Sequence, residues 1–212
     1  MRRVANLILL IVALAIMPES ASAQFDLSKA LGTLLGGSSK STTTTTTNDP
    51  YKKLADAAPA ASTLNGTWAY SSATFTYVGN NPLADVVVAQ LDPIIADVMR
   101  QMGVTPGSAE VSLQSGVGVV SHGDSEIRGK YAYQRSTAGI TVSTTYEGKS
   151  VSVSGYVKYA SNTLTVLLDV KQLVKAIKTV YPELKSDQNI VLIESLLKDI
   201  SGVYAVGKFK RK

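Results

Sequence analysis

The sequence predicts a mainly β protein with a few helices, built as an antiparallel β-barrel of eight or nine strands. Beyond residue 63, apolar residues alternate with polar ones, as in strands that have one buried and one solvated face. Short turns join consecutive segments, which favours neighbours in one antiparallel sheet. An open sheet of that size would leave two exposed edges, and closure into a barrel removes them. The first and last strands should therefore pair.

The first predicted strand covers 64–78, where threonine and aromatic residues are dense. A helix is expected over 82–102, because apolar residues recur there every three or four positions. Pro93 should kink or break this helix, and Gly103 should end it.

About sixty residues of strand-like pattern follow. Tight turns are expected at 147–149 and 160–162. The residues on the mainly apolar side of the pattern are Val111, Leu113, Val117, Val119, Ile127, Tyr131, Tyr133, Ile140, Val142, Thr144, Tyr146, Val151, Val153, Val157, Tyr159, Leu164, Val166 and Leu168.

Two helices and a closing strand complete the domain. Asp169 can cap the first helix, and Ser186 or Asp187 can cap the second. The final strand covers 203–210, with either Tyr204 and Val206 or Val203 and Phe209 facing inward. Periodicity leaves open whether the helices plug the barrel or pack outside it.

The first 23 residues read as a secretory signal peptide, with Arg2 and Arg3 before an apolar run and a small-residue cleavage site at 21–23. That run, about 14 residues, is shorter than the roughly 20 needed to span a bilayer. Because the chain has no cysteine, a lipid-anchored product is excluded. We expect a soluble exported protein, periplasmic or extracellular, without a membrane anchor after cleavage.

Residues 24–62 are expected to form a short apolar segment followed by a flexible tether rich in serine and threonine. The barrel domain is then expected over 63–212. If the protein has an envelope partner, residues 24–50 are the segment expected to dock with it.

Composition excludes several kinds of chemistry. With no cysteine and one histidine, the chain cannot form disulfides, zinc fingers, iron–sulfur sites or a multi-histidine metal site by itself. The formal charge of +5 is mild, and no basic stripe with interleaved aromatic residues suggests nucleic-acid binding.

No catalytic or metal-binding constellation stands out. Ser121, His122 and Asp124 are close in sequence, but a catalytic triad usually draws on distant segments, and Gly123 favours a hairpin turn. A divalent ion held by His122, Asp124 and Glu126 is likewise not expected. Asp85, Asp92 and Asp97 are expected on the solvated face of the first helix. We therefore expect no catalytic residue, no metal and no cofactor.

Several motifs carry a family resemblance over residues 60–212. Gly66-Thr67-Trp68 resembles the Gly-x-Trp signature of lipocalins and other calycins. The ordered set more closely resembles the lipocalin-like domain of unknown function found in secreted proteins of Gram-negative gut bacteria. Its other matching segments are 64–70, 82–83, 156–158, 162–165, 196–200, 202–204 and 209–210. Many lipocalins pack an arginine on the tryptophan; here the nearest candidates are Lys208, Lys210 and Arg211, so this closure is expected to differ.

The resemblance implies a binding module that holds a small hydrophobic or amphiphilic ligand. Tyr131, Tyr133, Tyr146 and Tyr159 fall on faces expected to point inward, where rings can pack and hydroxyl groups can orient a ligand. Gly66 and Trp68 are expected to be structural, with Trp68 as a plug at the barrel base. Two alternatives stay open: a structural or interaction protein with a solid barrel, and a barrel enzyme.

Overall fold

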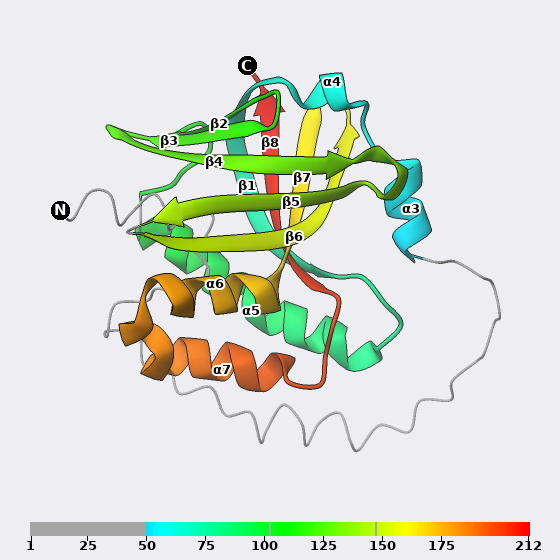
Figure 1. The fold of residues 1–212 in the computed structure, drawn as a ribbon. Coiled ribbons are helices and arrows are strands. Elements are labelled where there is room, and N and C mark those ends of the chain that lie inside the picture. Colours follow the sequence, from blue (N-terminus) through cyan, green and yellow to red (C-terminus); the bar gives the residue numbers. More distant parts are fainter. Residues whose placement is uncertain (1–49, 102, 147) are drawn as a thin grey trace.

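A computed structural model describes residues 50–101, 103–146 and 148–212 of the chain. These residues form one closed antiparallel barrel of eight strands, with helices gathered mainly at one end (Figure 1). The barrel confirms the predicted fold. The expected signal peptide, the apolar segment at 25–35 and the threonine run lie outside the described residues.

Each strand pairs with the next one along the chain, and β1 pairs with β8 to close the barrel. The closing register runs from Trp68 opposite Arg211 to Tyr77 opposite Val203, with a shift between Tyr70 and Ser72. The predicted pairing of the first and last strands is therefore confirmed. The strands are β1 (Gly66–Tyr77), β2 (Ala109–Gln114), β3 (Val117–His122), β4 (Ser125–Gln134), β5 (Gly139–Tyr146), β6 (Lys149–Ala160), β7 (Thr163–Asp169) and β8 (Val203–Arg211).

The longer helices interrupt the strand order twice. Helix α5 (Pro82–Gln101) lies between β1 and β2 and continues through Pro93 as one helix, so the predicted break does not occur. Helices α6 (Val170–Val180) and α7 (Gln188–Leu197), joined by the 3-10 turn η2 (Pro182–Ser186), lie between β7 and β8. Asp169 caps α6 as predicted, since its Oδ1 accepts a hydrogen bond from Gln172 N at 2.8 Å.

The apolar core has two parts inside this framework. At one end, the three helices α5, α6 and α7 cover the barrel, and Leu91, Leu173 and Ile193 pack with the strand residues Phe75 and Ala205 (Figure 1). At the other end, Trp68 packs in a smaller cluster with Leu64, Leu113, Ile140, Val157 and Leu164. The helices therefore cap one mouth of the barrel, while the tryptophan fills the opposite end.

Two short helices precede β1. Helix α3 (Pro50–Asp56) packs on the outside of the barrel, and α4 (Ala61–Leu64) lies at the tryptophan end (Figure 1). Leu54 of α3 is buried against Tyr204 and Val206. Contacts with the barrel thus begin within the segment expected to form the tether.

The two faces of strand β8 are both buried, one inside the barrel and the other under α3. Phe209 and Ala205 line the interior, so the alternative with Val203 and Phe209 facing inward is correct. Tyr204 and Val206 point outward but are buried under α3, because Leu54 covers them.

In strand β3, the alternation of Val117 and Val119 did not mark the inward face. In β3 the inward positions are Gly118 and Val120, whereas Val117 is 37% exposed. Gly118 has no side chain, so the apolar pattern of Val117 and Val119 indicated the wrong face.

Candidate ligand cavity in the barrel

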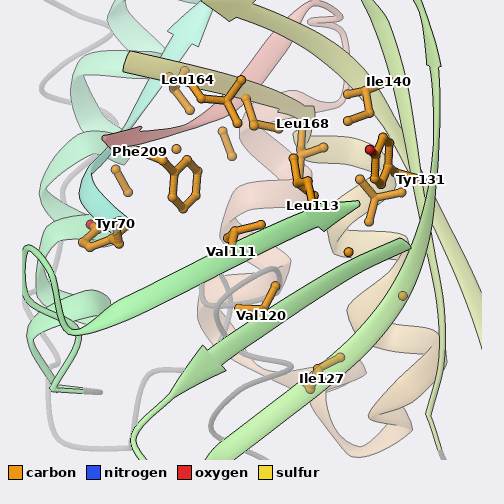
Figure 2. Close-up of a pocket in the computed structure, with 18 of the residues that line it drawn as sticks. Tyr70, Val111, Leu113, Val120, Ile127, Tyr131, Ile140, Leu164, Leu168 and Phe209 are labelled. Carbon is orange, nitrogen blue, oxygen red and sulfur yellow. The ribbon is translucent and has the colours of Figure 1, made fainter. Parts of the chain in front are cut away.

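A cavity of about 150 Å³ lies in the barrel interior between the helix-capped end and the tryptophan end (Figure 2). Its wall is made mainly by inward-pointing side chains of the strands. Ile95 and Met99 of α5 and Leu173 of α6 line it from the helical end. The labelled strand residues in Figure 2 are Tyr70, Val111, Leu113, Val120, Ile127, Tyr131, Ile140, Leu164, Leu168 and Phe209.

Glycine at inward positions explains why the space is not filled. Gly118 on β3 pairs directly with Gly129 on β4, so two adjacent inward positions have no side chain. Gly207 on β8 also lines the cavity. At Gly129 a Cβ would lie 2.8 Å from the Ser143 carbonyl oxygen, so this position cannot take a side chain without a backbone shift. Counting glycines at inward positions would have predicted the hollow; a search for functional side chains did not.

The wall is almost entirely apolar, with few groups able to form hydrogen bonds. Tyr70 and Tyr131 lie on opposite sides of the cavity (Figure 2). Thr144 also lines the cavity, but its hydroxyl donates to the Arg128 carbonyl at 3.2 Å. Burial raises the pKa of Tyr70 above its ordinary value, with a smaller opposing effect from a hydrogen bond to the Ala73 backbone. The Tyr70 hydroxyl is therefore neutral at physiological pH and can orient a ligand without introducing charge.

The four predicted tyrosines do not come together. Tyr131 lines the cavity. The Tyr133 hydroxyl donates to the Pro59 carbonyl at 2.7 Å, and the Tyr159 ring meets Trp68 edge-on at 6.0 Å. Tyr146 lies 6.1 Å from Tyr181 near the helices. Tyr70, which the alternation pattern did not single out, lines the cavity as well.

Trp68 lies buried at the base of the barrel. Its side chain is fully buried, and Nε1 donates to the Leu64 carbonyl at 2.9 Å. The Arg211 guanidinium lies 5.1 Å from the centre of the indole ring, and its Nη2 donates to Asn65 O at 2.7 Å. The expectation of a different closure was wrong, because Arg211 at the end of β8 reaches the tryptophan.

Gly66 makes room for this closure. It has a φ of +135°, and a Cβ at this position would lie 3.1 Å from Arg211 Nη2. Both the backbone conformation and the close approach of the guanidinium therefore favour glycine.

The other polar candidates have structural positions. His122 pairs with Ser125 across the β3–β4 hairpin, and Gly123 turns the chain with a φ of +55°, as predicted. No group of three metal-ligating side chains occurs among the described residues. Asp92 is half-buried rather than fully solvated, because its Oδ1 accepts a hydrogen bond from Phe75 N at 2.6 Å.

Within the described part of the chain, no helix has both the length and the apolar character needed to cross a membrane.

Comparison with known proteins identifies one family. A family model described as a lipocalin-like domain (DUF4923) matches residues 39–211. No curated protein and no solved structure matches the chain.

Proposed function

Because the chain belongs to the lipocalin-like family DUF4923, and its barrel is hollow, we propose that it binds a small hydrophobic or amphiphilic ligand inside the barrel. The observation that carries this proposal is the apolar cavity of about 150 Å³. Protein interiors are normally close-packed, and a void among apolar side chains loses dispersion contacts. A ligand would restore those contacts.

The size and chemistry of the cavity restrict the ligand. Pockets for drug-sized molecules measure about 300–1,000 Å³, whereas an apolar cavity of about 150 Å³ accepts a molecule such as benzene. We therefore expect a compact apolar body, such as one aromatic ring or a short branched chain. The hydroxyl groups of Tyr70 and Tyr131 fit one hydroxyl or carbonyl group on that body.

The same cavity favours binding over the solid-barrel alternative, in which the protein serves a structural or interaction role. We further propose that the protein is exported through the segment at 1–23 and acts in the cell envelope without catalysis. N-terminal sequencing of the protein secreted by a Gram-negative host tests export, since cleavage should leave Gln24 as the first residue.

The binding experiment uses toluene, indole and p-cresol as probes, with binding followed through the methyl resonances of the cavity in NMR spectra. Gly118→Leu should abolish binding by filling the cavity. At Gly118 a Cβ would lie 3.3 Å from Leu113 Cδ2, a flexible side-chain atom, so the wall can adapt. The control is Val117→Leu, because this neighbouring side chain is exposed on the outer face.

A second variant tests orientation. Tyr131→Phe removes one hydroxyl group and should weaken p-cresol binding without changing toluene binding. The proposal fails if no probe shifts the cavity resonances, or if the folded Gly118→Leu variant binds the probes as tightly as the wild type.

A further inference from the structure

We propose that the outer wall of the barrel carries a second binding site, a polar groove that takes a neutral saccharide. The groove has a volume of about 510 Å³ and crosses the outer faces of β4, β5 and β6. It is bounded by the N-terminal end of α6 on one side and by Tyr204 of β8 on another. It lies on the other face of the wall from the ligand cavity, with Ile140 lining both hollows.

Strand register explains why this wall is hollowed. Ala132, Thr141 and Ser154 stand opposite one another on three adjacent strands. In the next row of outward positions, Gly139 lies opposite Tyr156. Ala132 and Gly139 have little or no side chain, so the floor is low, and larger residues around it form the sides.

Hydrogen bonds hold the polar groups of the groove in place. Gln172 Oε1 accepts from Ser154 N at 2.8 Å, and the hydroxyl groups of Thr141 and Ser154 are 3.2 Å apart. Asp169 Oδ1 accepts from Gln172 N at 2.8 Å. A glutamine bound through its oxygen keeps two amide donors, and the second carboxyl oxygen of Asp169 has further acceptor capacity. The groove thus presents both donors and acceptors that need little reorganisation on binding.

One partly exposed aromatic ring completes the lining. Tyr156 lines the groove and packs edge-to-face on Tyr204 with the ring centroids 5.6 Å apart, while Tyr204 itself is buried beneath α3. An aromatic face carries partial negative charge, which attracts the C–H groups on one side of a sugar ring. The Tyr156 ring beside amide, hydroxyl and carboxylate groups therefore matches a ligand with both C–H faces and hydroxyl groups.

The lining argues against other ligand classes. Among the described residues, the groove has one carboxylate, that of Asp169, and no lysine or arginine, which disfavours phosphates and carboxylates. Its polar lining also disfavours purely apolar compounds. A peptide that binds as an added strand needs a free sheet edge, and each of the eight described strands is paired on both sides. A neutral saccharide satisfies the remaining donors and acceptors and the ring of Tyr156.

The test is saturation-transfer NMR on the mature protein with glucose, N-acetylglucosamine, maltose and cellobiose as probes. We expect at least one of these sugars to bind with millimolar or better affinity. Ala132→Trp should abolish this binding by filling the groove floor, because residue 132 is exposed on the outer face. Gln134→Ala, at the groove rim, should weaken it about fivefold by removing one hydrogen-bonding group.

The matched control is Ala160→Trp, which places the same side chain at an exposed position at the end of β6, outside the groove lining. It should bind the sugar as the wild type does. Toluene binding in the barrel cavity should be unchanged in all three variants, so failure of this site and failure of the cavity proposal can be distinguished. Lack of binding by all four sugars, or equal sugar binding by the folded Ala132→Trp variant, would overturn the inference.

Discussion

Replacing Arg211 by methionine should loosen the closure of the barrel around Trp68. The guanidinium lies 5.1 Å from the indole centre and donates to Asn65 O at 2.7 Å, so the substitution removes two interactions at once. A cation–π contact at an exposed site contributes about 0.5–1 kcal/mol, and a hydrogen bond contributes about 1 kcal/mol. The free energy of unfolding should therefore fall by about 2 kcal/mol. For a domain of this size, that lowers Tm by about 4–8 °C.

Urea unfolding followed by tryptophan fluorescence measures this change directly, because Trp68 is the one tryptophan in the chain. Arg211→Lys keeps the charge but loses the planar guanidinium, so its free energy of unfolding should fall by about 1 kcal/mol. Lys210→Met is the control, since Lys210 is exposed and its substitution should change stability by less than about 0.5 kcal/mol. Equal stability of Arg211→Met and Lys210→Met would refute the closure argument.

Three further predictions test other parts of the fold. Leu54→Ala should lower the free energy of unfolding by about 2–3 kcal/mol in urea titrations, because Leu54 is buried between α3 and the outer face of the barrel. Lys53→Ala, at an exposed position, should leave that free energy unchanged. Asp92→Ala should lower the free energy of unfolding, measured in urea, by about 1–2 kcal/mol, because Phe75 N loses its acceptor. Asp92→Asn keeps an acceptor oxygen and should recover most of that loss. Burial raises the pKa of Tyr204, so its stabilising effect is complete below pH about 10 and is lost as the pH rises further. Urea midpoints of Tyr204→Phe should fall less steeply than wild type above pH 10; parallel curves would contradict this.

Local patterns were sufficient to predict most of the fold. In 139–169, strict alternation and two tight turns predicted three strands, and β5, β6 and β7 occupy that region. Alternation works there because each strand has one apolar and one polar face. It also placed Ile127 and Tyr131 on the inner side of β4.

The candidate site was less predictable. Of the four tyrosines chosen for their inward positions, Tyr131 lines the cavity, while Tyr133 and Tyr159 pack around the tryptophan end. Alternation gives the face of a side chain but not its height along the barrel axis. That height depends on the stagger between strands, which is set when the barrel closes.

By itself, the sequence determined the strand and helix order and the pairing of neighbouring strands, because these depend on local periodicity and short connections. Tertiary structure decided which face of β8 points inward, since α3 buries the outward side chains Tyr204 and Val206 from outside the barrel. It also decided where the hollow lies, because Gly118 and Gly129 leave space only when two strands bring them opposite each other. Contacts between distant segments set both outcomes, and a pattern read along one strand does not contain them.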